Sequence, residues 1–517
     1  MPITSSTPST RPARSAPSTG PVTPAMATVS CDDGLVVMDE YVPPTISYSQ
    51  NRKRMDSLRM LYNIGTGPSA SHTLGPRRAA QHFEKECADL ITLHPNISFR
   101  VTFYGVMAQV GTVHLTDVAV YSVLGPRAKL AWVPNQKLQH HPNGMIFDAF
   151  ADDEALARGD KPLRSETYYS VGGGAILLGD GNPPAEDVEE KPTTNMYEGF
   201  TRMNKIAKYC REKKLSLIDF VYEQEGPELR EYLKKVWTVM VAAIECGLPK
   251  TQPVEASRDM KYPRKAYHYL RQAKAITDEV LSRNPEMASI KKHKYILAYA
   301  MATSQENASA TTEVVAAPAF CCSGVVPGVF YYYKQHYGST DEEIVDALAA
   351  AGLIGNLAKS YASILGADCG CQAEIGVATA MAAAGCIHLL DALTVREGGT
   401  HMALDELNHA MEYAAVMALK HNLGLTCDPV RGLVVVPCIE RNGMAALYAD
   451  DCAETAFLNF ADDLVSWDEV LHTMFDTGIS MNEKYKDTSQ GGLAITYVLD
   501  EIRDGAIVVQ RAATTAN

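Results

Sequence analysis

The spacing of apolar residues divides the chain into two regions. Before residue 180, apolar and polar positions alternate in Asn96–Val106 and Val113–Val123, and both runs are rich in β-branched residues, which predicts two strands. The other patterned runs are Lys129–Val133 and Tyr168–Leu178, which are strand-like, and Asn51–Tyr62 and Pro76–Leu90, which have helical spacing. Strands mixed with helices predict an α+β domain over residues 48–178.

Beyond this region the pattern becomes helical. Gly179–Thr194 is polar and rich in proline and glycine, which is typical of a surface linker, and we place that linker at residues 179–198. Six later runs have a helical period or an alanine-rich composition: Met203–Lys213, Leu229–Ala243, Pro263–Arg283, Asp341–Lys359, Glu374–Leu393 and Asp405–His421. The predicted fold is an α+β N-terminal domain followed by a larger all-α catalytic domain, residues 199–510, whose loops supply the chemistry.

Composition narrows the class of protein. The chain has 517 residues, 46% of them hydrophobic and 21% charged, which fits two folded domains of a soluble protein. A formal net charge of −14 argues against nucleic acid or an anionic membrane surface as the main partner. The uncharged stretch Val314–Tyr333 is interrupted by Pro318 and Pro327, so a buried loop is expected there rather than a membrane span. Twelve cysteines without a signal-peptide pattern indicate reduced thiols and a cytoplasmic protein.

Residues 1–47 are predicted to form a disordered tail. The first 31 residues contain six prolines, several Ser and Thr, and no acidic residue. Arg11 and Arg14 in this acid-free run also allow a mitochondrial transit peptide. The prolines oppose the amphipathic helix that such a peptide forms, so the disordered tail is favoured.

Three cysteines stand in turn-forming sequence. Cys427 and Cys438 lie in one run, GLTCDPVRGLVVVPCIER, and Cys371 lies upstream in GADCGCQAEIG. A cysteine that only fills a core needs no such turn, whereas a thiol aimed at a metal often does. The spacing fits neither a zinc ribbon nor a ferredoxin, so a metal site and three buried core cysteines remain equally good interpretations. Three thiolates without a fourth ligand would leave one coordination position open for chemistry.

A polar loop precedes a predicted helix at residues 67–76, GPSASHTLGP. The polar residues of this loop are Ser69, Ser71, His72 and Thr73. Their hydroxyl and N–H groups could hold a substrate carboxylate, or they could simply cap the helix.

Two further stretches contain histidine. Asp117 follows His114 closely enough to orient its imidazole, which suits a general base, although a structural histidine is the more common outcome. The turn His140–Gly144 is polar, but no third residue suggests itself as a metal ligand there.

Two glycine-containing stretches are candidate anion sites. The run 484–493, KYKDTSQGGL, combines lysines, hydroxyls and paired glycines, and it could hold an anionic substrate group or form a solvated turn. Gly172–Gly174 precedes a linker rather than a helix, which disfavours a phosphate loop and nucleotide binding.

These motifs occur together, and in this order, in one family. The chain resembles the iron–sulfur L-serine dehydratases, in the form in which a β domain and an α catalytic domain share one polypeptide. GPSASHTLGP resembles the family's GPSSSHTVGP, and HPNGM and TYYSVGGG are similar to motifs of its β domain. GADCGCQAEIGVA, HNLGLTCDPV, VPCIERN and KYKDTSQGGLA resemble its cluster and C-terminal motifs. The resemblance runs from about Asn51 to Val498.

The resemblance implies a cofactor and a reaction. A 4Fe–4S cluster would be held by Cys371, Cys427 and Cys438, with the fourth iron free for substrate, and the family's Gly-Cys-Gln motif favours Cys371 over Cys369. The implied reaction is β-elimination of water from L-serine to give pyruvate and ammonia, with the open iron as a Lewis acid. The expected partner is a small amino acid, and a homodimer is the expected assembly.

The resemblance also implies roles for individual residues. The implied catalytic residues are His114, which removes the Cα proton, His72 and Lys484. The implied substrate-binding residues are Ser69, Ser71, His72, Thr73, Asn143, Gly144, Ser489, Gln490 and Gly491.

The chain departs from the family motifs at several positions. Where the family has Ala-Pro-Thr-Asn/Cys-Gly, this chain has Ala-Pro-Ala-Phe-Cys at Ala317–Cys321, which introduces Phe320. Where the family has Lys-Glu-Asn-Ala-Ser-Ile-Ser-Gly, this chain has Lys-Ser-Tyr-Ala-Ser-Ile-Leu-Gly at Lys359–Gly366, which introduces Tyr361. The remaining departures are Leu115 in place of glycine, Ala70 in place of serine, and an insertion near Leu393–Glu406.

These departures leave two alternative functions open. If the altered positions line the pocket, the same cluster could act on threonine, cysteine or a larger amino acid. A non-catalytic, cluster-bearing or ligand-sensing homologue is the other alternative, and the intact GPSASHT and SQGG loops argue against it.

Overall fold

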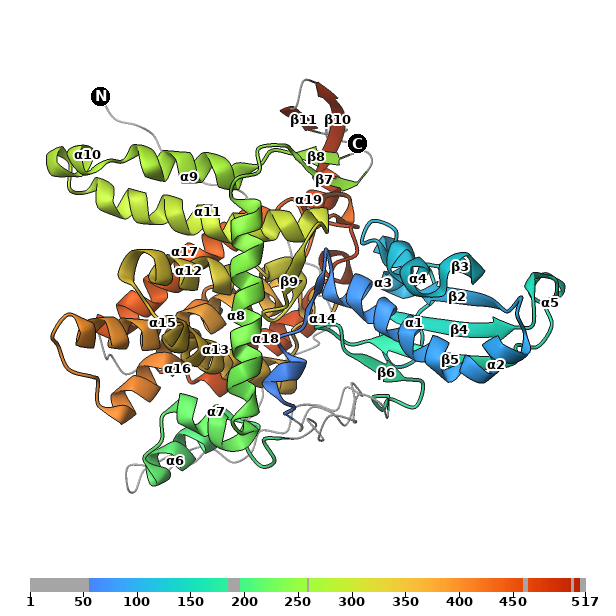
Figure 1. Ribbon diagram of the computed structural model, residues 1–517, viewed down its shortest axis with the longest axis horizontal. Coiled ribbons are helices and arrows are strands. Elements are labelled where there is room, and N and C mark those ends of the chain that lie inside the picture. Colours follow the sequence, from blue (N-terminus) through green and yellow to red (C-terminus); the bar gives the residue numbers. More distant parts are fainter. Residues whose placement is uncertain (1–54, 185–195, 258–259, 459–463, 504–505, 512–517) are drawn as a thin grey trace, which may run out of the picture. The chain divides into compact units, whose positions relative to one another are not determined.

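The computed structural model describes residues 55–184, 196–257, 260–458, 464–503 and 506–511. An α+β N-terminal part is followed by a larger helical part, so the predicted fold class is confirmed (Figure 1). The predicted tail, with its mitochondrial alternative, and most of the predicted linker lie outside the described residues.

The elements of the N-terminal part are short. Its strands are β1 (Ile64–Thr66), β2 (Ser98–Tyr104), β3 (Ala128–Val133), β4 (Gly144–Phe150), β5 (Arg164–Ser170) and β6 (Ile176–Leu178). Its helices are α1 (Gly75–Glu86), α2 (Ala88–Leu93), α3 (Gly105–Val110), α4 (Thr116–Leu124) and α5 (Asp153–Arg158).

The helical part has longer elements. It begins with α6 (Met203–Lys213), α7 (Leu217–Glu225), α8 (Glu228–Gly247), α9 (Lys265–Ala275), α10 (Asp278–Arg283) and α11 (Met287–Ser309). It continues with α12 (Val325–Tyr337), α13 (Asp341–Tyr361), α14 (Gly366–Cys369), α15 (Ile375–Arg396), α16 (Leu404–Lys420), α17 (Cys438–Leu458), α18 (Trp467–Ser480) and α19 (Leu493–Thr496). Its short strands are β7 (Val254–Ser257), β8 (Met260–Tyr262), β9 (Glu313–Val315), β10 (Tyr497–Arg503) and β11 (Ala506–Arg511).

A five-stranded sheet forms the centre of the N-terminal part, with strand order β3-β2-β4-β5-β6. Only β2 and β3 are parallel, and α3 and α4 form the crossover that a parallel pair requires. Phe83 of α1 packs against the sheet, with its ring centroid 5.5 Å from that of Phe147 on β4 and 6.0 Å from that of Phe99 on β2. Val120 and Leu124 of α4 belong to the same buried cluster, so both helices bury their apolar faces against the sheet.

One predicted strand is a helix. The run Val113–Val123 contains most of α4, whose buried residues, Thr116, Ala119, Val120 and Leu124, recur every one to four positions along one helical face. Val118 and Tyr121 point to solvent instead, with 54% and 43% of their surfaces exposed. The strand prediction was wrong because it relied on β-branched composition, whereas tertiary packing of one helical face decides the conformation.

Three other predicted elements need correction. Tyr168–Leu178 is not a single bent strand, because Gly172–Gly174 all adopt positive φ and reverse the chain between β5 and β6. Val314–Tyr333 is not a buried loop, because it holds part of β9 and most of α12, whose first turn accommodates Pro327. The described part of Asn51–Tyr62 contains only one 3₁₀ turn, Leu58–Met60.

The core of the helical part is organised around α15. This helix packs against α12, α13, α16 and α17, and it is apolar on all sides. The segment Cys371–Arg396 is long and apolar enough to cross a membrane, but 89% of its most apolar window is buried inside the protein. It is therefore a core helix rather than a membrane span.

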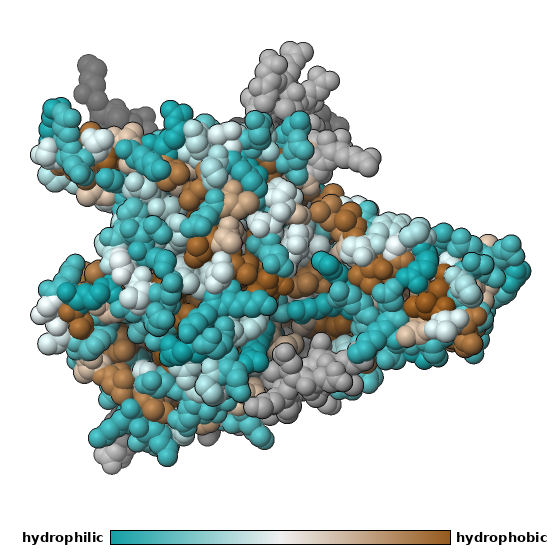
Figure 2. All heavy atoms as spheres, viewed as in Figure 1, coloured by the Kyte–Doolittle hydropathy of each residue, from teal (hydrophilic) through white to brown (hydrophobic). Residues whose placement is uncertain are grey.

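The two parts are joined through the segment before α1. β1 pairs with β9 of the helical part, with Ile64 opposite Val315. The Asn307 side chain of α11 then donates a hydrogen bond of 2.9 Å to the Pro68 carbonyl. On the face seen in Figure 2, hydrophobic residues gather between the helical part and the sheet, while hydrophilic residues cover most of the helices. The GPSASH loop is thus held against α11.

Substitution of Gly67 should disturb this junction. A Cβ at Gly67 would lie 2.0 Å from the Asn307 Oδ1 and 2.5 Å from its backbone oxygen, whereas a Cβ at Gly65 would lie 3.1 Å from the Phe320 ring and 3.4 Å from the Leu74 side chain. We expect Gly67→Ala to lower the free energy of unfolding by about 1–3 kcal/mol. Gly65→Ala is the matched control and should cost clearly less, as urea denaturation would show; equal losses would contradict the close approach of Gly67 to α11.

Candidate functional site

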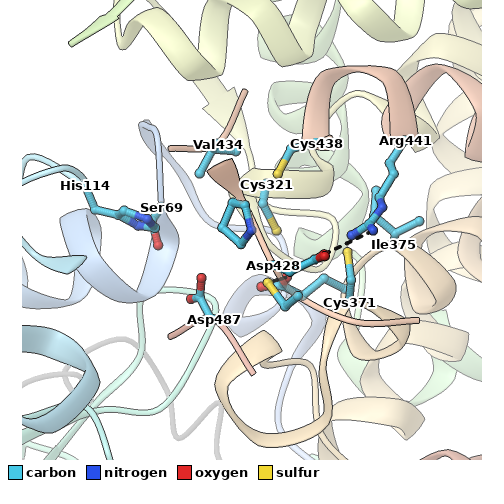
Figure 3. A pocket seen from close by; sticks show the side chains of 13 residues that line it. Ser69, His114, Cys321, Cys371, Ile375, Asp428, Val434, Cys438, Arg441 and Asp487 are labelled. Atoms are coloured by element: carbon cyan, nitrogen blue, oxygen red, sulfur yellow. Dashed lines mark hydrogen bonds and ion pairs between the residues drawn. The ribbon is translucent and has the colours of Figure 1, made fainter. Parts of the chain in front are cut away.

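One cavity brings the two parts of the chain together. It is lined by Ser69 and His114 from the N-terminal part and by loops of the helical part (Figure 3). The thiols in its wall are Cys321, Cys371, Cys427 and Cys438. The charged groups are Glu374, Asp428, Asp487 and Arg441.

Backbone geometry directs the three predicted ligands to this cavity. Cys371 opens a 3₁₀ turn before α15, and Cys438 is the first residue of α17. Cys427 lies in a loop whose backbone pairs with the C-terminal segment, since its N–H donates to the Tyr485 carbonyl at 2.8 Å. Asp487 returns a hydrogen bond of 2.9 Å to the Cys427 carbonyl. The structure therefore brings the predicted cysteine trio together.

The spacing of the thiols bears on what they could hold. The sulfur atoms of the trio do not all lie within 4.8 Å of one another, although all three side chains are described. A single tetrahedral zinc ion would hold its thiolates about 3.8 Å apart, because Zn–S bonds are about 2.3 Å long. The three sulfur atoms are therefore not placed for one tetrahedral zinc ion.

The trio is protonated unless a cation joins it. Burial raises the pKa of Cys371 to about 12, and burial also raises the pKa values of Cys427 and Cys438. Arg441 is the only cationic side chain in the cavity wall, and its Nη1 donates to the Thr426 carbonyl at 2.8 Å. Thiolates would form here when a metal displaces their protons.

Two buried carboxyl groups were missed by the sequence interpretation. Burial raises the pKa of Glu374 to about 7, and its carboxylate accepts a hydrogen bond of 3.9 Å from the Cys427 thiol. Burial raises the pKa of Asp487 to about 8. Arg441 was missed as well, although it follows Cys438 by three residues, as Glu374 follows Cys371. On a helix this spacing places two side chains on the same face, and it is the signal that could have found both.

The C-terminal loop is fastened to the cysteine loop by Asp428. The Leu493 N–H donates to Asp428 Oδ2 at 2.8 Å, and Gly492, at φ +55°, leaves no room for a Cβ beside that oxygen. Lys484 and Gln490 are exposed, and neither lines the cavity. The Lys484 ammonium instead lies 4.9 Å from the centre of the Tyr485 ring.

Ser489 and Gly491 of the same loop are placed closer to the site. The Ser489 Oγ would lie 3.0 Å from a Cβ on Gly432, which is the residue that contacts His114. This hydroxyl is buried and has no protein partner among the described residues. Gly491 packs against Lys484 and Tyr485, so its role is in the fold of the loop.

His114 is held in one tautomer. Its Nε2 lies 2.5 Å from the Gly432 carbonyl, which can only accept a hydrogen bond, so Nε2 carries the proton. Nδ1 therefore carries the lone pair, and this buried atom has no partner in the part of the chain that the structure describes. Burial lowers the pKa of His114 to about 4 and keeps the ring neutral. The group that orients the ring is the Gly432 carbonyl rather than Asp117.

The GPSASHT residues surround His114. Ser69 accepts a hydrogen bond of 3.2 Å from the His72 N–H and so caps the helical turn Ala70–Leu74, yet it also lines the cavity. The Thr73 hydroxyl donates to the His114 carbonyl at 2.7 Å. The Ser71 hydroxyl lies 3.0 Å from His72 Nδ1. Both interpretations of this loop, cap and cavity wall, therefore apply to Ser69.

His72 and Asn143 stand behind this wall. The His72 and His114 rings are 4.8 Å apart, and burial lowers the pKa of His72 well below its usual value. The Asn143 side chain is fully buried, and neither of its polar atoms has a partner among the described residues. Gly144 begins β4 and packs against Leu138. Neither His72, Asn143 nor Gly144 lines the cavity itself.

Most departures from the family motifs lie away from the cavity. Phe320 and Ala70 belong to a separate buried apolar cluster, and the Tyr361 ring stacks 4.4 Å from the Arg202 guanidinium. Leu115 adopts φ +58°, a conformation that favours glycine. Cys321 is the departure that reaches the cavity.

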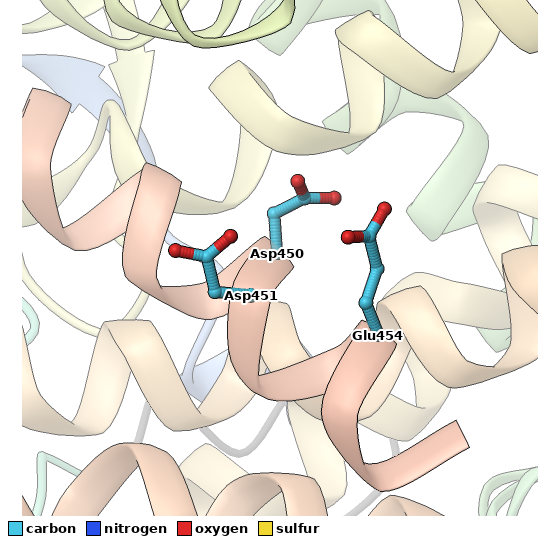
Figure 4. Close-up of side chains that lie close together, drawn as sticks. All are labelled: Asp450, Asp451 and Glu454. Carbon is cyan, nitrogen blue, oxygen red and sulfur yellow. The ribbon is translucent and has the colours of Figure 1, made fainter. Parts of the chain in front are cut away.

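An acidic cluster on α17 is a different kind of site. Asp450, Asp451 and Glu454 lie close together (Figure 4). The Lys292 ammonium lies 2.6 Å from the Asp450 carboxylate and also contacts Glu454. A side-chain cation thus already occupies this cluster, and we interpret it as an ion-pair network.

Neutral histidine, hydroxyl and thiol groups around one buried cavity define the site of an enzyme rather than a purely structural metal site. Comparison with known sequences agrees with this class. The family model described as serine dehydratase alpha chain matches residues 203–494, and that described as serine dehydratase beta chain matches residues 57–127 and 122–180.

Curated relatives match over nearly their whole length. L-serine dehydratase of Haemophilus influenzae is 33% identical over 486 residues, covering 86% of this chain and 100% of the relative. L-serine dehydratase TdcG of Escherichia coli is 35% identical, covering 85% of this chain and 98% of the relative. L-serine dehydratase of Streptomyces coelicolor is 34% identical with the same coverage. The chain belongs to the serine dehydratase family, which confirms the predicted family and the expectation of a lyase.

The buried histidine should make stability depend on pH. The pKa of His114 is about 4 in the folded protein and about 6.5 in an unfolded chain, so the unfolded state binds the extra proton more readily. The contribution of His114 to the free energy of unfolding is complete above pH 6.5 and decreases as the pH falls toward 4. At pH 5 it is smaller by about 2 kcal/mol.

His114→Gln removes this titration while leaving an N–H that can reach the Gly432 carbonyl. We expect the variant to lose less stability than the parent between pH 7.5 and pH 5, as urea midpoints at the two pH values would show. Equal losses in both proteins would contradict a neutral, buried His114.

Proposed function

We propose that this protein is an iron–sulfur L-serine dehydratase, which eliminates water from L-serine and yields pyruvate and ammonia. The observation that carries the proposal is the shared cavity: His114 and Ser69 of the N-terminal part face the same space as Cys371, Cys427 and Cys438 of the helical part. The names of the relatives support serine as substrate.

The donor set fits a 4Fe–4S cluster. Cys371, Cys427 and Cys438 would hold three of its irons, since they are buried thiols from three separate turns around one cavity. Arg441 would offset part of the negative charge of the thiolates. When bound, such a cluster supplies a Lewis acid that makes the substrate hydroxyl a better leaving group.

His114 is suited to remove the Cα proton of the substrate. Its Nδ1 is an unpartnered lone pair in the cavity wall, and the hydrogen bond from Nε2 to Gly432 fixes the ring. The Gly432 carbonyl also favours the imidazolium that forms when Nδ1 takes the proton. The low pKa of the free site keeps the base unprotonated at neutral pH.

Ser69 is suited to bind the substrate carboxylate. Its hydroxyl lines the cavity at the start of a helical turn, where N–H groups also point toward a bound anion. Asn143, His72 and Ser489 carry buried polar atoms without a partner among the described residues, but they do not line the cavity, so we assign them no direct contact with substrate. Lys484 is not included, since it is exposed.

The choice between L-serine and a larger amino acid depends on which residues line the cavity. Elimination produces an enamine, which takes up water and releases ammonia to leave pyruvate. The alternative that the true substrate is a larger amino acid required Phe320 and Tyr361 to line the pocket. Both side chains pack away from the cavity instead. We therefore favour L-serine over larger amino acids as the substrate.

Replacement of one ligand should remove both metal and activity. We expect Cys427→Ser, purified without oxygen, to lose most of its iron and sulfide and to lower kcat for pyruvate formation at least 100-fold. Cys452→Ser is the matched control, because Cys452 is a buried thiol of α17 outside the cavity wall. A Cys427→Ser protein with full iron content and activity would reject the ligand set.

The substrate itself is tested by parallel assays of L-serine, L-threonine and L-cysteine on iron-loaded protein. We expect kcat/KM for L-serine to exceed that for L-threonine by about 10–200-fold, which is the usual range for one extra methyl group. Iron-loaded protein that releases no pyruvate from L-serine would reject the proposed reaction.

A further inference from the structure

A fourth thiol faces the cavity that the three predicted ligands share. Cys321 lies in the 3₁₀ turn Phe320–Cys322 before α12, far in sequence from the other three cysteines. Figure 3 shows its sulfur pointing into the same space as the side chains of Cys371 and Cys438. No other cysteine among the described residues joins these four in the cavity wall.

One amide ties Cys321 to the Cys438 ligand. The Asn442 Nδ2 of α17 donates to the Cys321 carbonyl at 2.7 Å and to the Cys438 carbonyl at 2.9 Å. Its Oδ1 accepts from the Gly324 N–H at 2.9 Å, so both ends of the buried amide are used. The turn that carries Cys321 is thereby fixed relative to the first turn of α17.

The neighbouring cysteine shows that this placement is specific. The Cys322 thiol points into the core and lies 3.2 Å from the Ala319 carbonyl and 3.6 Å from the Ala317 carbonyl. Cys321, in contrast, lines the cavity, and Cys322 does not. Of these two adjacent thiols, only Cys321 therefore belongs to the wall of the cavity that the trio shares.

We propose that Cys321 is a fourth ligand of the cluster site, which occupies the coordination position left open by Cys371, Cys427 and Cys438 until substrate displaces it. This proposal rests on the proposed iron–sulfur function. Ligation breaks the S–H bond of Cys321, forms an S–Fe bond, releases one proton to solvent and changes no oxidation state. Substrate binding reverses these changes, so the thiol protects the open iron when substrate is absent.

Oxidative loss of iron provides the test, because an iron without a protein ligand is the one that a 4Fe–4S cluster loses. The full-length parent, Cys321→Ala, Cys321→Ser and the control Cys322→Ala are reconstituted without oxygen, assayed for iron and sulfide, and titrated with ferricyanide. Electron paramagnetic resonance then measures the 3Fe–4S signal. We expect both Cys321 variants to convert several-fold more readily than the parent and Cys322→Ala.

Two further outcomes separate this proposal from the proposed function. Added L-serine should abolish the difference between the parent and the Cys321 variants, since substrate then occupies the same coordination position in all of them. Equal conversion of all four proteins without substrate would overturn the role of Cys321 and leave the cluster intact. Absence of iron and sulfide from all four proteins would reject the cluster and, with it, this proposal.

Discussion

The site depends on burying several acidic groups around one cavity with a single cationic side chain among them. Three thiols of the trio, Glu374 and Asp487 all have raised pKa values, with burial as the main cause, while only Arg441 brings positive charge. Thiolates cannot accumulate there without a further cation, because unpaired buried charges cost several kcal/mol each. A metal-containing group relieves this constraint, since its binding replaces protons by positive charge.

The same constraint explains why the loops around the cavity are so firmly held. Three of the cysteine turns are fastened by a side chain or segment from elsewhere: Asn442 holds the turns of Cys321 and Cys438, and the C-terminal segment pairs with Cys427. Asp428 then anchors the C-terminal loop through the Leu493 N–H. Ligands that come from distant parts of the chain keep their positions only when such partners fix them.

The N-terminal part contributes the histidine of the site, His114. None of the described cavity-lining residues of the helical part is a histidine. His114 is held at the cavity because α1, α4 and the GPSASHT loop pack together and the Gly432 carbonyl accepts the hydrogen bond of its Nε2. Chemistry that needs both a Lewis acid and a base therefore requires the junction of the two parts, which β1, β9 and Asn307 maintain.

Helical periods predicted the fold class because they leave a local signal. Turn residues beside Cys427 and Cys438 left a metal site and buried core cysteines equally good, and only the family resemblance selected the trio, which the structure places around one cavity. The helix α4 was predicted as a strand, since its β-branched residues outweighed a weak helical spacing. The partner of His114 could not be predicted, because a backbone carbonyl 318 residues away has no sequence signature. Cys321 was passed over for the same reason: only the fold shows that it faces the cavity and Cys322 does not.

The most direct test of the central claim is X-ray diffraction from anaerobically grown crystals, with anomalous data collected on both sides of the iron absorption edge. The account predicts iron density for a multi-iron group inside the cavity, bonded to the sulfur atoms of Cys371, Cys427 and Cys438. A single metal ion there, or iron bound elsewhere while these three thiols remain free, would contradict it.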